Sequence, residues 1–120
     1  MNLLRKRLGI NGEKLKMSKR ILIADDDENT LIIFNKILTN KGYEVITAIS
    51  ANEALKYCNE EFDIAIIDGF EGDYTKVYEG LKNVERKVVC SGNRECIKDC
   101  NKKGWIAYEK PVGLSTLLEE

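Results

Sequence analysis

The sequence has no histidine, a single proline and only four cysteines in 120 residues. The cysteines form no CxxC pair, and without histidine they lack the partners that would complete a zinc site. We therefore expect them to act as small apolar side chains in a reducing compartment. They are Cys58, Cys90, Cys96 and Cys100, and the last two, one helical turn apart, are expected to share a helix face.

Long apolar runs are also missing. The chain has no stretch of about 18 apolar residues that would span a membrane. Leu3 and Leu4 are followed at once by three basic residues, which leaves no apolar core for a secretory signal. An apolar fraction of 43% in a chain of 120 residues suits one globular domain. We expect a cytoplasmic protein without a membrane span.

Charge is unevenly distributed, although the formal net charge is only −1. Residues 1–20 contain seven basic residues and one acidic residue, a net charge of +6, which leaves −7 for residues 21–120. The acidic character of this larger part argues against direct nucleic-acid binding by it. We expect residues 1–18 to be a basic N-terminal extension and residues 19–120 to be the domain.

The N-terminal extension has two interpretations. Leu3, Leu4 and Leu8 would share one side of a short amphipathic helix, and basic amphipathic helices bind membranes or acidic partners. Alternatively, the domain begins at Met17 and the preceding residues form a flexible arm. The sequence alone leaves both interpretations open.

From residue 20 onward, short apolar runs alternate with segments of helical periodicity. The pattern predicts strands at 21–24, 44–48, 64–68, 88–91 and 105–109, and helices at 28–40, 51–60, 74–83, 93–102 and 114–118. Ser50 and Glu53 form a capping box for the second helix, whereas Gly42 and Gly104 are expected to end the first and fourth. Strands separated by helices indicate an α/β fold, a doubly wound five-stranded parallel sheet with helices on both faces, of flavodoxin-like type.

Polar side chains follow four of these strands, at the edge where ligands bind in such sheets. The first strand ends in Asp25 and Asp26, the third in Asp68, the fourth in Ser91 and the fifth in Lys110. Three converging carboxylates need a cation, and hard oxygen ligands suit Mg²⁺. Because a lysine and a hydroxyl can bind phosphoryl oxygens, the set contains the parts that phosphoryl transfer requires, including a carboxylate nucleophile.

These four motifs, in this order and at these strand ends, resemble the CheY-like receiver domains of two-component response regulators over residues 19–118. The resemblance implies that Asp68 accepts a phosphoryl group from a sensor histidine kinase or a phosphotransfer protein. It also implies that Mg²⁺ is held by Asp25, Asp26, Asp68 and the backbone carbonyl of Phe70. The family is a signalling domain and not an enzyme, although it assists its own phosphoryl transfer and hydrolysis.

The resemblance assigns the remaining site residues as well. Ser91 and Lys110 would bind the phosphoryl group, and the Lys110-Pro111 peptide bond would be cis. The phosphoryl group would then switch a protein-binding surface, whose downstream target the sequence does not name. Asp27 has a simpler interpretation, because an aspartate directly before a helix is a common cap.

Several features depart from the family pattern. The loop after Asp68 contains no proline, the stretch from Asp68 to Ser91 is short, and the last helix has only two turns. The family usually has Tyr or Phe three residues before the lysine, and here that residue is Ala107. Tyr108 follows it, and a shift of one residue along a strand points a side chain to the opposite face.

Two alternatives stand beside this prediction, and the departures favour the first of them. The first is a degenerate receiver, or pseudo-receiver, that acts as a constitutive protein-interaction module. The second is a phosphatase or phosphotransferase of the haloacid dehalogenase type, whose D-x-D pair Asp25 and Asp27 would match. Asn29 stands where that family has Thr or Val, and the chain is short for that fold, so the receiver is the prediction.

Overall fold

The structure, a computed structural model, describes residues 19–118 of the chain. In these residues, five parallel strands form one sheet in the order β2-β1-β3-β4-β5. The predicted N-terminal extension at residues 1–18 lies outside the described residues. The strands are β1 (Arg20–Ala24), β2 (Glu44–Ala48), β3 (Glu61–Asp68), β4 (Asn83–Ser91) and β5 (Ile106–Glu109). A helix lies in each connection between consecutive strands, which confirms the predicted doubly wound parallel sheet.

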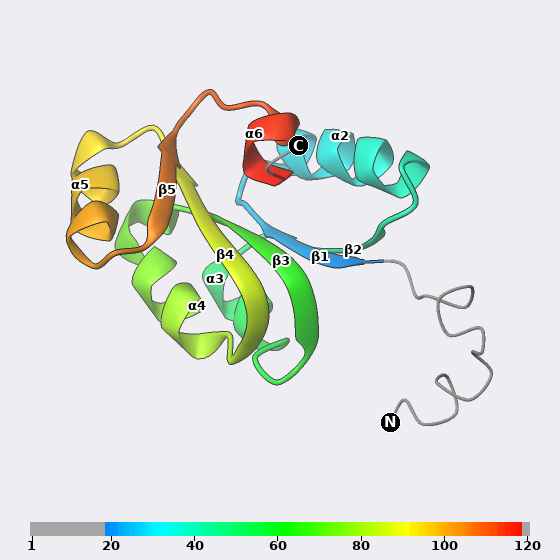
Figure 1. Cartoon of the computed structure of the whole chain (residues 1–120), viewed down its shortest axis with the longest axis horizontal. Helices are drawn as coiled ribbons and strands as arrows, with labels where there is room; N and C mark the ends of the chain where they lie inside the picture. The colour runs from blue at the N-terminus through cyan, green and yellow to red at the C-terminus, as the bar shows by residue number, and fades with distance from the viewer. Residues whose placement is uncertain (1–18, 119–120) are drawn as a thin grey trace.

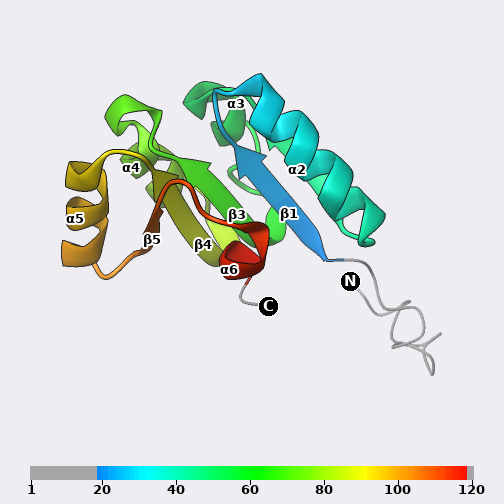
Figure 2. The ribbon, with the colours of Figure 1, turned by 90° about the horizontal axis from the view of Figure 1, so that it is seen from above.

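Helices cover both faces of the sheet (Figures 1 and 2). They are α2 (Glu28–Asn40), α3 (Ala51–Leu55), α4 (Tyr74–Gly80), α5 (Arg94–Lys102) and α6 (Leu114–Leu118), with a short 3-10 helix η1 (Phe70–Gly72) before α4. Because strand side chains alternate between faces, Ile21 and Ile23 pack beneath α2 and α6, whereas Leu22 and Ala24 pack on the side of α3, α4 and α5. Burial on both faces explains the unbroken apolar runs.

The predicted helix caps are found where the sequence places them. The Asp27 side chain accepts a hydrogen bond from the Asn29 N–H group at the start of α2. The Ser50 hydroxyl accepts from the Glu53 N–H group, and the Glu53 carboxylate in turn accepts from the N–H group of Ile49. The buried residues of α5 are Cys96 and Cys100, which share its inner face as predicted.

Two helices are shorter than predicted, and two strands are longer. α3 ends at Leu55 instead of residue 60, because the backbone N–H groups that follow donate to carbonyls three residues back, as in turns, and not four residues back, as in an α-helix. α4 ends at Gly80 instead of residue 83. β3 and β4 begin earlier than predicted, at Glu61 and Asn83, and there Glu61 pairs with Asn83 and Phe62 with Val84. At Asn83, pairing between the two strands therefore overrides the local helical periodicity.

β4 extends beyond its neighbour β5 at one end of the sheet. β5 pairs with β4 only from Val88 to Ser91. Among the described residues, the strand segment 83–87 therefore pairs with β3 on one side and with no strand on the other.

No helix within residues 19–118 combines the length and the apolar character that crossing a membrane requires.

Candidate functional site

Asp25 lies at the carboxyl edge of the sheet, where β1 turns into α2. Its backbone N–H donates to the Ala48 carbonyl of β2 over 3.0 Å, which continues the β1–β2 pairing by one residue. The residue is only 6% exposed, and its Oδ1 accepts the N–H group of Asp27 over 2.9 Å. Burial raises the pKa of the Asp25 carboxyl, and the hydrogen bond from the Asp27 N–H group opposes this effect.

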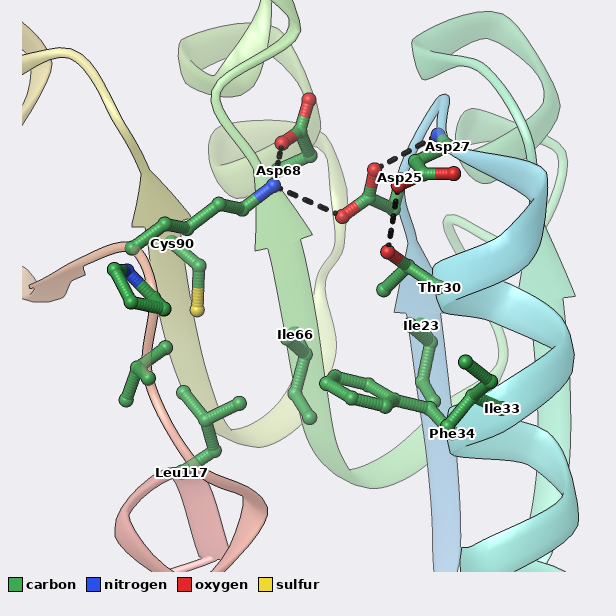
Figure 3. Close-up of a pocket in the computed structure, with 13 residues that line it drawn as sticks. Ile23, Asp25, Asp27, Thr30, Ile33, Phe34, Ile66, Asp68, Cys90 and Leu117 are labelled. Carbon is green, nitrogen blue, oxygen red and sulfur yellow. Dashed lines mark hydrogen bonds and ion pairs between the residues drawn. The ribbon is translucent and has the colours of Figure 1, made fainter.

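Asp68 lies at the end of β3, beside Asp25. Its Oδ2 accepts the N–H group of Phe70 over 2.9 Å, and its Oδ1 accepts a hydrogen bond from the Lys110 ammonium over 2.6 Å. The same ammonium donates to Asp25 Oδ2 over 3.1 Å, so that it bridges the two carboxylates (Figure 3). Burial alone would lower the pKa of Lys110, but the hydrogen bonds that its ammonium donates to Asp68 and Asp25 raise it to about 12.

Asp25, Asp26 and Asp68 form the one acidic cluster in residues 19–118 whose geometry suits a metal ion. One carboxylate oxygen from each lies within 4.8 Å of the others, with Asp25 buried and Asp26 exposed. Mg²⁺ binds oxygen ligands at about 2.0–2.1 Å, so ligands on opposite sides of the ion stand about 4.2 Å apart. The cluster thus needs only small side-chain rotations to hold one ion, and Asp26 gives it access from solvent.

Asp27 belongs to the helix and not to the metal cluster. Its two carboxylate oxygens accept hydrogen bonds from the Asn29 N–H group at 3.1 Å and the Thr30 hydroxyl at 2.9 Å. These bonds, that of Thr30 first, lower the pKa of Asp27. The interpretation of this residue as a helix cap is confirmed.

The loop after Asp68 has an unusual backbone. Phe70 and Glu71 both have positive φ, at 46° and 52°, a region that residues other than glycine rarely adopt. The Phe70 carbonyl, the expected backbone ligand, accepts the N–H group of Asp73 over 3.0 Å. A carbonyl oxygen has two lone pairs, so one hydrogen bond leaves it able to bind a cation as well.

Ser91 lies buried against the same loop and is 6% exposed. Its Oγ accepts the N–H group of Asn93 over 3.0 Å, which leaves the hydroxyl proton to donate elsewhere. A Cβ atom on Gly69 would lie 2.8 Å from this oxygen, so the residue after Asp68 must be a glycine for Ser91 to stay in place. No pattern in the sequence indicated this contact.

Lys110 directly follows β5, the strand that pairs with β4 and its last residue Ser91. Its backbone N–H donates to the Ser91 carbonyl over 2.9 Å, and the Lys110-Pro111 bond is cis, as the resemblance implied. The structure thus gathers at one edge all five side chains that the sequence singled out: Asp25, Asp26, Asp68, Ser91 and Lys110.

Position 107 differs from the family pattern in the way the sequence predicts. Ala107 packs with the core on the α4 and α5 side, whereas Tyr108 packs with the core beneath α2 and α6. Tyr108 therefore does not replace the missing ring. Trp105 shares the face of Ala107 and stacks on Tyr78 of α4, with ring centroids 3.8 Å apart.

Tyr74 is a residue that the sequence did not single out. It is 7% exposed at the start of α4, and its hydroxyl donates to Asp99 of α5. Its N–H group donates to the carbonyl of Gly69, the residue after Asp68, over 3.3 Å. Asp99 also pairs with Lys103, whose ammonium lies 4.7 Å from the centre of the Trp105 ring. Contacts thus run from the loop after Asp68 to the surface of α5.

Known proteins share this arrangement. A response regulator receiver domain protein of CheY-like type from Methanospirillum hungatei is 33% identical, with 85% of this chain and 89% of that chain covered and a TM-score of 0.65. A chain of the CheX-CheY complex with BeF3 and Mg²⁺ from Borrelia burgdorferi is 29% identical, with 95% and 93% covered and a TM-score of 0.68.

A curated relative is much longer than the matched region. The transcriptional regulatory protein YrkP of Bacillus subtilis, described as uncharacterized, is 38% identical over 52 residues. The match spans 43% of this chain and 22% of that protein, about a fifth of its length. No protein-family model matches the chain.

Proposed function

The chain belongs to the family of CheY-like response regulator receiver domains, and from this premise we propose that it accepts a phosphoryl group on Asp68 in two-component signalling. The observation that carries the proposal is the position of Asp68. Its carboxylate lies within hydrogen-bond distance of the Lys110 ammonium and beside two further aspartates at the edge of the sheet. The phosphoryl donor would be the phosphohistidine of a sensor kinase or of a phosphotransfer protein.

Mg²⁺ would be held by Asp25, Asp26 and Asp68, with the carbonyl oxygen of Phe70 as a fourth ligand. The donor set fits this ion, because it consists of hard oxygens with an exposed aspartate at its entrance. When bound, the ion supplies positive charge that neutralises phosphoryl oxygens and holds them in line for transfer.

The side chains of this chain would carry out the transfer itself. A carboxylate oxygen of Asp68 attacks phosphorus, the bond from phosphorus to the histidine nitrogen breaks, and an acyl phosphate forms. Lys110 exchanges its bond to Asp68 for one to a phosphoryl oxygen, and the Ser91 hydroxyl donates to another. Because Lys110 also contacts Asp25, the ammonium stays at the site throughout the exchange.

The output would pass through Tyr74, since Ala107 offers no ring to turn inward. Capture of the phosphoryl group moves Ser91 and the loop at Gly69, which contact one another. Tyr74 is bonded to that loop through its N–H group and to Asp99 of α5 through its hydroxyl. A shift of the loop is thereby passed to α5, whose outer surface would change its affinity for a protein partner.

A constitutive binding module is the second candidate function. Two observations favour it: position 107 lacks an aromatic ring, and Lys110 already neutralises Asp25 and Asp68. Such a module would present the same surface on α5 with or without phosphate at the carboxyl edge.

The intact mass of the chain after incubation with acetyl phosphate and Mg²⁺ tests the proposal. We expect the gain of one phosphoryl group, which is absent in Asp68→Asn and when Mg²⁺ is chelated. Asp27→Asn is the matched control, because this aspartate caps α2 and lies outside the metal cluster. A folded wild-type chain that gains no mass would favour the constitutive module.

A further inference from the structure

An apolar groove opens below the acidic edge, between α2 and α6 (Figure 3). Its volume is about 470 Å³. Ile23, Ile66 and Cys90 of three adjacent strands form its floor, while Phe34 of α2 and Leu117 of α6 form its walls. Asp25, Asp27, Asp68 and Lys110 line its upper end, so the groove is continuous with the proposed phosphorylation site.

On one side of the groove, α6 contributes the five residues Leu114–Leu118. Beside it, α2 exposes Ile33, which lines the groove, to 53%, and Ile37, one turn further along, to 40%. Neighbouring exposed apolar side chains beside a groove are typical of an interaction surface.

We propose that the N-terminal residues 3–8 of this chain occupy the groove. Leu3, Leu4 and Leu8 are the apolar side chains of that segment, and they fall on one side of a helical turn. The other three residues, at positions 5–7, are all basic. This pattern complements a groove whose walls are apolar and whose upper end has three aspartates and one lysine.

The chain is long enough for this contact. β1 runs along the groove floor, and its first residue, Arg20, is one strand length from Asp25. Five residues of strand measure about 17 Å. The connecting residues 9–19 span about 17 Å as a helix and about 36 Å when extended, so residues 3–8 reach the groove in either form.

The contact has a consequence for the site, and this part of the inference rests on the proposed function. Basic side chains at the upper end of the groove lie beside Asp25 and Asp68 and lower the local negative charge. The N-terminal segment therefore competes with Mg²⁺ and acts as an internal brake on phosphorylation.

Paramagnetic NMR of the full chain tests where the segment lies. A nitroxide is placed on Asn2→Cys in a Cys58→Ser background, since Cys58 is partly exposed and the other cysteines are buried. We expect strong line broadening at the amides of Ile33 and Val112 beside the groove, and little at Lys98 on α5. Equal broadening at all three would overturn the proposal.

Two controls define the occupant. Replacing Leu3, Leu4 and Leu8 by serine in the labelled chain is expected to abolish the broadening, and its persistence would contradict apolar docking. Mixing nitroxide-labelled chain with unlabelled ¹⁵N chain reports contacts between molecules. Broadening that is as strong in the mixture would assign the groove to a second copy of the chain.

Mg²⁺ titration, followed at the amides of Asp26 and Phe70, tests the brake. The triple leucine-to-serine variant is expected to bind Mg²⁺ about threefold more tightly than the wild type, with a difference that shrinks in high salt. Equal affinity would overturn the brake. If neither chain binds Mg²⁺, the proposed function fails, and the NMR broadening alone decides whether the segment docks.

Discussion

The hydroxyl group of Tyr74 donates to the carboxylate of Asp99, and this bond joins the first turn of α4 to the middle of α5. Tyr74 is buried in the core, while Asp99 lies at its border and also pairs with Lys103. The bond therefore ties the helix that follows the acceptor loop to the helix that would present the output surface.

Removal of that hydroxyl is expected to destabilise the domain. Tyr74→Phe keeps the ring in place and removes the hydrogen bond, which we expect to lower the free energy of unfolding by about 1 kcal/mol. Urea denaturation measures the difference. Tyr108→Phe is the control, because the structure gives the Tyr108 hydroxyl no hydrogen bond within residues 19–118. Equal losses in the two variants would contradict a stabilising role for the bond.

The effect of Tyr74→Phe should depend on pH. The hydrogen bond from Tyr74, and then that from Lys103, lowers the pKa of Asp99 below its ordinary value of 3.8. A depressed carboxyl pKa contributes stability above pH 4, and that contribution is lost as the pH falls through the folded-state pKa. Tyr74→Phe is therefore expected to cost more at pH 7 than at pH 3 in urea denaturation. A cost that is the same at both values would show that the ionised carboxylate is not the acceptor.

Tyr74→Phe should also weaken the switch. Mg²⁺ and beryllium fluoride, which mimic the phosphoryl group, are expected to change the NMR chemical shifts of amides in α5 of the wild type. In the variant we expect these changes to be about half as large, since coupling energies of this kind are about 1 kcal/mol. Amide shifts at Ser91 should be the same in both chains. Undiminished shifts in α5 would exclude the route through Tyr74.

A methyl group on Gly69 should disturb the site directly. In Gly69→Ala the new Cβ would meet the Ser91 Oγ at 2.8 Å and the Ser91 Cβ at 3.1 Å, and overpacking of this kind costs about 1–3 kcal/mol. We expect slower phosphorylation of Asp68 together with lower stability in urea. Gly113→Ala is the matched control, because a Cβ there meets nothing within 4 Å. Unchanged phosphorylation and unchanged stability in Gly69→Ala would show that Ser91 can shift away from the methyl group at no cost.

Loss of the Lys110 ammonium should have opposite effects on metal binding and on phosphoryl transfer. In Lys110→Met, Asp25 and Asp68 lose their cation, so Mg²⁺ is expected to bind more tightly. Phosphorylation by acetyl phosphate is expected to slow about 100-fold, since a donor to the developing charge is lost. Calorimetry and intact mass measure the two effects, with the exposed Lys98→Met as control. Weaker Mg²⁺ binding in Lys110→Met would contradict competition between the ammonium and the ion.

The sequence predicted the carboxyl ends of the strands well because they carry the strongest patterns. The last residues of β1 and β3 are an unbroken apolar run, and the polar residue that closes it marks the carboxyl end, as at Asp25 and Asp68. The opposite faces of Ala107 and Tyr108 followed from the two-residue period of a strand alone.

Features that depend on contacts between distant segments were not predicted. The early part of β4, from Asn83 to Lys87, mixes charged and apolar residues, and its strand conformation comes from pairing with β3. The bond between Tyr74 and Asp99 spans 25 positions and needs the packing of two helices. The contact of Gly69 with Ser91 likewise appears only when two strand ends stand side by side.

The end of β4 that extends beyond β5 has, within the described part of the chain, no strand beside it on that side. An open strand edge is a template on which a strand of another molecule can add. Here the edge has three successive charged side chains: Glu85 is exposed, and the half-buried Arg86 and Lys87 donate to the carbonyls of Leu117 and Tyr78. A foreign apolar strand would have to desolvate Glu85 and lie beside the other two charges. The charges that hid this strand from sequence analysis thus also protect the sheet from edge-to-edge aggregation.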